Sequence, residues 1–256
     1  MTPSPNPEPS RVSDVLSGRR RPEGTLLDGL SLRSRSLMIQ LGQTRPYAKG
    51  EPLPTGGPDN TVHIVLDGCV SQQRTHFGTS ILRFRGPGQV LEEHKLVEPD
   101  TPGPTTICLS GTTTLSFPAE ALQDLLKQHV VIERRLLTSL ETRNRMDERV
   151  YSMFKRPPLA RVSTLLHHLG ATVGVREQGP YGGVRIEGPR QRDLTDALLI
   201  GRSSVELALG RLREEGVIHN RYRAIVVRDM AALAEIAERP ETRTVKKVTV
   251  KKGKKG

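Results

Sequence analysis

The stretch from Gly188 to Val227 constrains the fold most, because helix, turn and strand signals follow one another within it. Its first part carries apolar residues at helical spacing, and Gly201 then interrupts that pattern where a tight turn is needed. A second helical pattern runs from Ser203, which with Glu206 makes a capping box, and ends before a terminating glycine. Two short β-branched runs follow around a polar tip. This order predicts a helix-turn-helix followed by a β-wing.

Polar residues of this stretch fall outside its apolar stripes, where a docked duplex would present bases and phosphates. The candidates for contacts to base edges lie on the second helix: Arg202, Ser203, Ser204 and Glu206. The candidates for phosphate contacts lie on the first helix and the wing: Arg190, Arg192, Arg221 and Arg223. The alternative is an ordinary helical hairpin whose apolar residues only form a core. The positions of the arginines favour DNA binding.

The charge balance also favours a polyanionic partner. The 256 residues carry 39 Lys and Arg against 28 Asp and Glu, a formal net charge of +11, which points to nucleic acid before a membrane. Apolar content of 35% and aromatic content of 3% are low for a globular chain, which indicates disordered segments. No apolar run approaches the ~20 residues of a membrane span, and the first residues have no hydrophobic signal core. We therefore expect a cytoplasmic protein without a membrane partner.

Signatures of cofactors and of catalysis are weak. Cys69 and Cys108 are too few for a disulfide framework or a four-cysteine cluster, and both lie in strand-like runs that favour buried thiols. His167 and His168 are adjacent in a helical pattern and point in different directions, so they do not make a metal pair. No phosphate loop, HExxH motif or catalytic triad stands out. We expect no metal, no cofactor and no enzymatic activity.

Changes in composition divide the chain into five segments and predict an α+β fold. Residues 1–22 are rich in proline, and we expect a disordered tail. Short β-rich runs between Gly and Pro predict an antiparallel β-roll over 23–117. Residues 118–156 predict a long dimerisation helix, and 157–238 hold the winged helix-turn-helix domain. The lysine-rich end, 239–256, predicts a flexible basic tail.

The long helix has apolar residues at the 4-3-4-3-4 spacing of a coiled-coil seam, interrupted by Arg143 and Asp147. A partner helix explains such a pattern better than packing on a small roll, which is the alternative. We therefore expect a homodimer. The residues predicted for its interface are Leu136, Leu140, Val150 and Phe154.

The order of these segments resembles the Crp/Fnr family of bacterial transcription regulators over about residues 23–238. These regulators combine a cyclic-nucleotide-binding-type β-roll, a long dimer helix and a winged helix-turn-helix. The most specific part of this resemblance is the stretch RQRDLTDALLIGRSSVELALGRLREEGVI, which aligns with the family's helix-turn-helix without a gap. Leu159–Leu169 is similar to the family's first DNA-binding-domain helix, and Tyr47–Val70 is similar to its opening strands, with the glycine turn at Gly68. The resemblance implies a dimeric, sequence-specific transcription factor that binds double-stranded DNA, with RNA polymerase as a candidate further partner.

The recognition helix departs from the family's pattern at two positions. Arg202 is kept, but Ser203 and Leu207 stand where the family commonly has glutamate and arginine. Leu199 replaces the usual turn glycine. The family's consensus operator is therefore not expected for this chain.

The nucleotide pocket departs further. Members that bind cyclic AMP hold its phosphate with a Gly-Glu pair and a downstream Arg-Ser or Arg-Thr, but no arginine lies between Gly88 and Thr106 here. A cyclic phosphate would then meet two carboxylates and no guanidinium. We expect a regulator that is not controlled by cyclic AMP and whose effector is unknown. The residues expected in its degenerate effector pocket are Glu92, Glu93, Thr105, Met146 and Asp147.

Two alternatives of other classes stay open. The net charge and the lysine-rich tail favour an architectural or low-specificity DNA-binding protein. The acidic pair Glu92 and Glu93 favours a signalling adaptor whose β-roll binds another protein or an unfamiliar small molecule.

Overall fold

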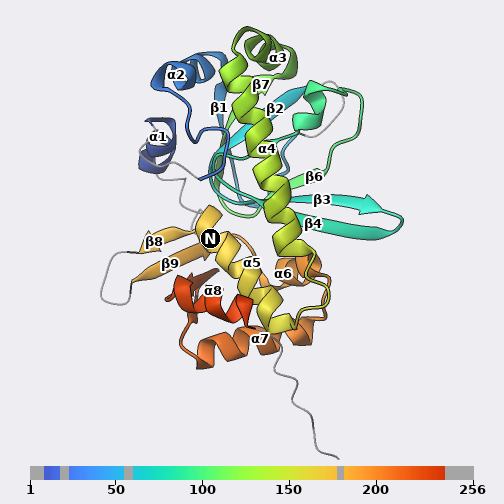
Figure 1. Cartoon of the computed structure of the whole chain (residues 1–256), viewed down its shortest axis with the longest axis vertical. Helices are drawn as coiled ribbons and strands as arrows, with labels where there is room; N and C mark the ends of the chain where they lie inside the picture. Colours follow the sequence, from blue (N-terminus) through green and yellow to red (C-terminus); the bar gives the residue numbers. More distant parts are fainter. Residues whose placement is uncertain (1–8, 18–22, 55–59, 178–181, 240–256) are drawn as a thin grey trace, which may run out of the picture.

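A computed structural model describes residues 9–17, 23–54, 60–177 and 182–239. Within these residues the chain forms an N-terminal β-roll, a long helix and a C-terminal helical domain with a small sheet (Figure 1). No helix of the described residues is long and apolar enough to cross a membrane. The predicted basic tail, 239–256, lies outside the described residues except for Arg239.

Two antiparallel sheets form the roll. The first has the strand order β1 (Gln43–Tyr47), β7 (Thr112–Pro118), β2 (Thr61–Asp67) and β5 (Val90–Leu91). The second has the order β4 (Thr79–Arg85), β3 (Val70–His76) and β6 (Thr105–Cys108). A short 3-10 helix, η1 (Glu93–Leu96), follows β5, and helices α2 (Leu32–Leu41) and α3 (Ala119–Gln128) flank the first sheet. These short paired strands match the expected roll.

Strand β2 is buried along its whole length because both of its faces meet apolar side chains. Val62 and Ile64 join one core with Phe117, while Val65 joins a second, smaller core. The turn after β2 requires glycine: Gly68 has φ +99°, and a Cβ there would lie 2.5 Å from the Gly111 carbonyl oxygen. The predicted glycine turn is therefore present at Gly68.

The N-terminal segment differs from the expectation. Residues 1–22 were expected to be disordered, but Pro9–Ser17 forms helix α1, which contacts α2 and β2. Val15 is fully buried in the roll core, and its carbonyl oxygen accepts a hydrogen bond from the Arg35 guanidinium at 3.2 Å. The prediction was wrong for these residues because apolar side chains at helical spacing follow the prolines. Residues 1–8 and 18–22 lie outside the described residues.

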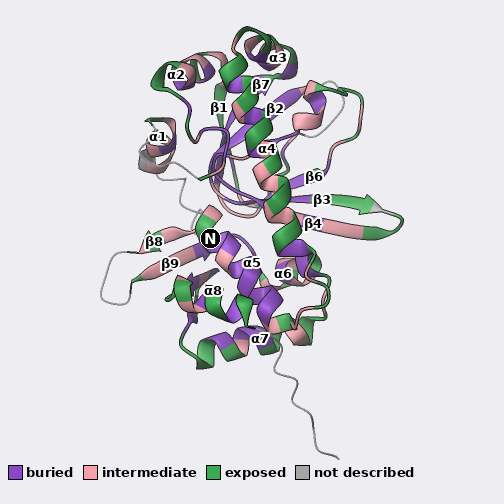
Figure 2. Ribbon diagram, viewed as in Figure 1, coloured by how far each residue is buried: buried purple, intermediate pink, exposed green. Residues whose placement is uncertain are grey.

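Helix α4 (Val130–Tyr151) runs from the roll to the C-terminal domain and is separated from α3 at His129 (Figure 1). Figure 2 shows that buried and exposed residues alternate along it, as expected for a helix packed on one side. Ile132 and Leu136 join the roll core, and Val150 and Tyr151 join the core of the C-terminal domain. The Tyr151 hydroxyl also accepts a hydrogen bond from the Phe84 backbone N–H of β4 at 3.2 Å.

This packing corrects the predicted dimer interface. Leu136 and Val150 are buried within the chain, and Leu140 packs against the roll core. The predicted stripe therefore faces the chain's own domains, as the intrachain alternative held, because the same helical spacing serves either partner. Phe154 is exposed, but it lies beyond the end of α4.

The C-terminal domain begins with α5 (Pro158–Thr172) and ends with α8 (Met230–Glu238). Its sheet has the order β10 (Ile218–Arg221), β11 (Ala224–Val227), β9 (Gly183–Glu187) and β8 (Val175–Glu177). Helices α6 (Gln191–Leu198) and α7 (Arg202–Glu214) form the helix-turn-helix. The apolar stripes predicted for these helices are buried, and they share one core with Cys69, Leu82 and Phe84 of the roll. The two domains are therefore packed together.

Candidate DNA interface and effector pocket

The turn between α6 and α7 differs in detail from the sequence prediction. Leu199 adopts the left-handed conformation, with φ 51°, where a glycine is usually favoured. Gly201 has φ −61° and serves as the N-cap of α7, so the capping box predicted at Ser203 is absent. Arg161 of α5 fixes the end of α6, because its buried guanidinium donates to the Leu198 carbonyl oxygen.

Helix α7 presents a polar outer face next to a buried inner stripe. Val205 and Leu212 are fully buried, whereas Arg202, Ser203 and Glu206 are exposed. The Arg202 guanidinium pairs with the Glu206 carboxylate at 2.9 Å. Ser204 is half-buried, and Leu207, at 76% exposure, interrupts the polar face. The predicted base-contacting residues therefore lie at the exposed start of α7.

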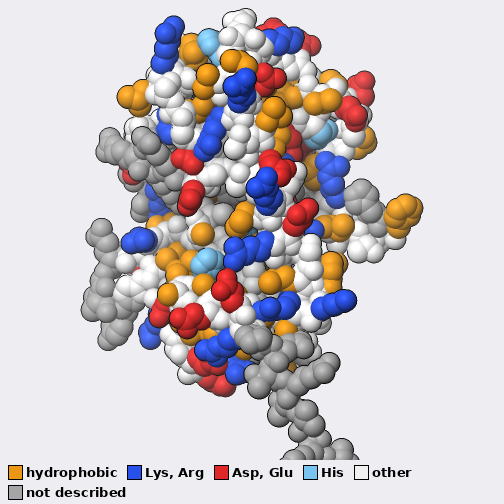
Figure 3. Space-filling model, viewed as in Figure 1, with side chains coloured by type: hydrophobic (Ala, Val, Ile, Leu, Met, Phe, Trp, Pro, Cys, Tyr) orange, Lys and Arg blue, Asp and Glu red, His pale blue; other side chains and the backbone are white. Residues whose placement is uncertain are grey.

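The predicted phosphate-contacting arginines are exposed on three neighbouring elements. Arg192 of α6 pairs with Asp196 at 3.7 Å, and Arg221 of the wing pairs with Glu177 of β8 at 2.8 Å. The other two carry no carboxylate partner among the described residues: Arg190 and Arg223. Figure 3 shows Lys and Arg side chains interspersed with acidic ones on this part of the molecule. The acidic partners on other elements, such as Glu177, escaped the sequence analysis because they are distant in the chain.

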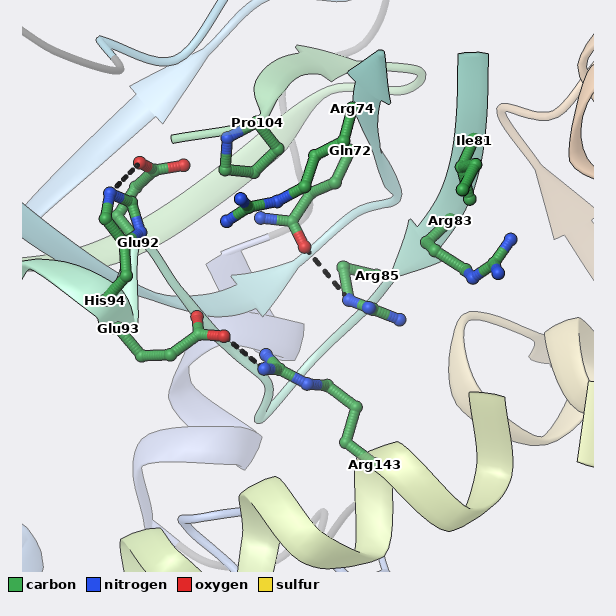
Figure 4. Close-up of a pocket in the computed structure, with 10 residues that line it drawn as sticks. All are labelled: Gln72, Arg74, Ile81, Arg83, Arg85, Glu92, Glu93, His94, Pro104 and Arg143. Atoms are coloured by element: carbon green, nitrogen blue, oxygen red, sulfur yellow. Dashed lines mark hydrogen bonds and ion pairs between the residues drawn. The ribbon is translucent and has the colours of Figure 1, made fainter. Parts of the chain in front are cut away.

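The roll contains a pocket of about 220 Å³ beside α4 (Figure 4). Its lining residues come from β3, β4, the 92–104 segment and α4: Gln72, Arg74, Ile81, Arg83, Arg85, Glu92, Glu93, His94, Pro104 and Arg143. Arg143 of α4 pairs with Glu93 of η1 and also donates to the Val90 carbonyl oxygen at 2.7 Å. Arg85 donates to Asp147 of α4 through two bonds of 2.9 and 2.7 Å. These ion pairs join the pocket to the long helix.

The two adjacent glutamates of the pocket have opposite environments. The Glu92 side chain is buried, and its backbone has the left-handed conformation. Burial raises the pKa of its carboxyl group to about 7. One carboxyl oxygen accepts from the Thr106 hydroxyl at 3.4 Å, and the other lies 3.8 Å from His94 Nε2 without a hydrogen bond. For Glu93, burial acts to raise the pKa, but the Arg143 charge and hydrogen bond lower it below its ordinary value.

The pocket corrects the expectation that no guanidinium is available. Four arginines line it, and they come from β3, β4 and α4 rather than from the segment between Gly88 and Thr106. Glu92 and Glu93 lie in the pocket as expected, but Thr105 is exposed and Met146 lines a separate cavity beside α5. Asp147 lies outside the lining and is paired with Arg85. No cluster of metal-ligating side chains occurs among the described residues.

The opposite environments predict opposite effects of two neighbouring substitutions. Because the unfolded chain releases the Glu92 proton at lower pH than the folded chain, the free energy of unfolding should fall as pH rises from about 4.5 to 7. Glu92→Gln should remove this fall. The free energy of unfolding that the variant gains over the wild type should therefore be larger at pH 8 than at pH 4, by up to about 3 kcal/mol. Glu93→Gln should lower stability at pH 8 by about 1–3 kcal/mol, because it leaves Arg143 unpaired. Urea unfolding of both variants at pH 4 and pH 8 measures these effects. A Glu92→Gln variant that gains no stability at pH 8 relative to pH 4, or a Glu93→Gln variant as stable as the wild type at pH 8, would contradict the assignment.

Comparisons with known proteins agree with this architecture. Residues 160–236 match the Crp-like helix-turn-helix domain. The chain is 24% identical over 221 residues to the cyclic AMP receptor protein of Thermus thermophilus, which covers 83% of this chain and 96% of that protein.

Two solved structures share the fold. The CRP-family transcriptional regulator TTHB099 of Thermus thermophilus superposes with a TM-score of 0.61 at 22% identity, covering 75% of this chain and 96% of that one. FixK2 of Bradyrhizobium japonicum gives a TM-score of 0.61 at 19% identity, covering 78% and 99%. The matched domain is one of transcriptional regulators rather than of enzymes. With the exposed face of α7 and the roll–helix–helix-turn-helix order, these matches show a Crp-like helix-turn-helix domain within a fold shared with CRP-family structures, and they support a DNA-binding transcriptional regulator.

Proposed function

We propose that the chain acts as a homodimer whose two α7 helices read the half-sites of an inverted repeat. The observation that carries this proposal is the outer face of α7, where Arg202, Ser203 and Glu206 are exposed while the inner stripe is buried. A helix of this kind enters the major groove with its N-terminal residues at the base edges. A bidentate contact of Arg202 with guanine would contribute ~1–3 kcal/mol of discrimination.

The outward face of α4 supports a dimer through a different set of residues from those expected. Val130, Val131 and Leu137 are exposed by 53%, 64% and 59%, respectively. Val130, Leu137 and the exposed Asn144 follow seven-residue spacing, which suits a seam between two parallel helices. A partner helix would cover these apolar side chains.

A selection of binding sites from random DNA tests both parts of this proposal. The wild-type chain should recover an inverted repeat with half-sites about one helical turn apart. Leu137→Glu should weaken the dimer in sedimentation and lose the repeat, because it places a charge on the apolar seam. Gln43→Glu, at an exposed position of β1 outside α4, adds the same charge away from this seam; it is the control and should behave as the wild type.

A selected site without two-fold symmetry, or a wild-type monomer at micromolar concentration, would contradict the dimer. Equal affinity for selected and random DNA at every salt concentration would instead support an architectural DNA-binding protein.

We also propose that cyclic AMP does not control this regulator in the family's manner. Arg85 and Arg143 are engaged by Asp147 and Glu93, and the buried carboxyl group of Glu92 stands where members that bind cyclic AMP have glycine. Arg74 and Arg83 also line the pocket and pair with no carboxylate among the described residues. Their charges favour an anionic effector of another shape.

Calorimetry tests this proposal directly. The wild-type chain should show no micromolar binding of cyclic AMP at neutral pH, because the phosphate would meet Glu92 and two arginines that are already paired. Glu92→Gly should bind cyclic AMP more tightly than the wild type, since it removes the carboxyl group and suits the left-handed backbone at this position. Micromolar binding by the wild type would overturn the proposal.

A further inference from the structure

A crevice of about 180 Å³ lies where the roll meets the first turn of α6 and the wing. Its cationic lining comes from both domains. Lys49 is contributed by the turn after β1 of the roll, and the C-terminal domain contributes Arg190, Arg221 and Arg223. The turn carrying Lys49 is distant in sequence from the other three, so only the folded chain brings these charges together.

The crevice has more positive than negative charge. Arg221 is paired with Glu177, but Lys49, Arg190 and Arg223 have no carboxylate partner among the described residues. The nearby acid is Asp193, whose carboxylate accepts a hydrogen bond from the Arg190 backbone N–H at 2.6 Å. Partial burial, followed by the charges of Arg190 and Arg223, lowers the pKa of Lys49. Cations held this close are stabilised when an anion lies between them.

Neutral hydrogen-bond donors, the side-chain amides of Gln191 and Asn220, also line the crevice. Gln191 lines the crevice, and its side-chain amide nitrogen is shielded from solvent and has no hydrogen-bond acceptor among the described residues. Asn220 of the wing supplies a second amide. Gln191 is the first residue of α6, where backbone N–H groups and the helix dipole favour an anion. Guanidinium, ammonium and amide donors together match the oxygens of a phosphate.

We propose that this crevice binds a backbone phosphate of DNA, so that Lys49 of the roll is part of the DNA interface. The proposal rests on the DNA-binding function of the chain. DNA is the favoured source of the phosphate because the crevice is bordered by α6, α7 and the wing, which are the elements that approach a duplex in a winged helix-turn-helix. A phosphate held by both domains would couple DNA affinity to their relative position.

The test is the salt dependence of DNA affinity for the full chain, measured with a selected duplex and a random duplex. Lys49→Gln should lower the slope of log K against log salt by about 0.9 and weaken binding about eightfold at 0.1 M salt relative to 1 M. The ratio of affinities for the two duplexes should not change, because a phosphate contact carries no sequence information. Lys49→Arg should keep the slope.

Lys127→Gln on α3 is the matched control, because Lys127 is exposed and its loss changes the net charge equally. A Lys49→Gln slope equal to that of Lys127→Gln would overturn the proposal. If the wild-type chain binds neither duplex, the DNA-binding function itself fails, whatever Lys49 does.

Thermal unfolding in inorganic phosphate and in chloride, at equal ionic strength, separates DNA from a free anion. Unfolding in chloride should give a midpoint for Lys49→Gln no lower than that of the wild type, because the substitution removes a charge that Arg190 and Arg223 repel; this shows that the variant folds. Stabilisation by inorganic phosphate that depends on Lys49, with an unchanged DNA slope, would assign the crevice to a small anion and overturn the DNA contact.

Discussion

The packing of one face of α4 against both domains is the constraint on which the rest of this structure depends. The helix contributes Leu136 to the roll core and Val150 to the core of the C-terminal domain. Between these two positions, Asp147 forms a bidentate ion pair with Arg85 of β4. Because one helix belongs to both cores, it sets the position of the helix-turn-helix relative to the roll. It also leaves its opposite face, with Val130 and Leu137, exposed.

Two ion pairs also join the pocket of the roll to α4. Arg143 of α4 is held by Glu93 of the roll, and Arg85 of the roll is held by Asp147 of α4. A ligand that competed for Arg143 or Glu93 would therefore act on the helix that connects the domains. On the DNA side, Arg192, Arg202 and Arg221 are each paired with a carboxylate of the chain. DNA phosphates at Arg192 and Arg221, and a base edge at Arg202, would have to replace these exposed pairs, which are individually weak.

Much of the C-terminal domain could be predicted from sequence, because its signals are local. The buried stripes Leu194–Leu198 and Val205–Leu212 follow from helical spacing alone. The exact turn could not be predicted, since Leu199 takes a conformation that sequence rules assign to glycine. The face of α4 that packs on the chain's own domains was also ambiguous, because apolar residues occur on both sides of the helix.

The pocket was the least predictable part. Its arginines lie on β3, β4 and α4, and only the tertiary fold brings them to Glu92. The segment from Gly88 to Thr106 contains no arginine, so the positive charge of the pocket could not be predicted from that segment alone. Lys49 was missed for the same reason, since nothing in its local sequence relates it to Arg190 or Arg223.

The central claim is that α7 gives this regulator its sequence specificity, and the base preference of Arg202→Ala tests it most directly. This variant should lose discrimination by ~1–3 kcal/mol at one base pair of each half-site and keep its other preferences. Arg211→Ala, near the other end of α7, should leave that base pair unaffected. An equal loss of affinity for all sequences on replacing Arg202 would contradict the claim.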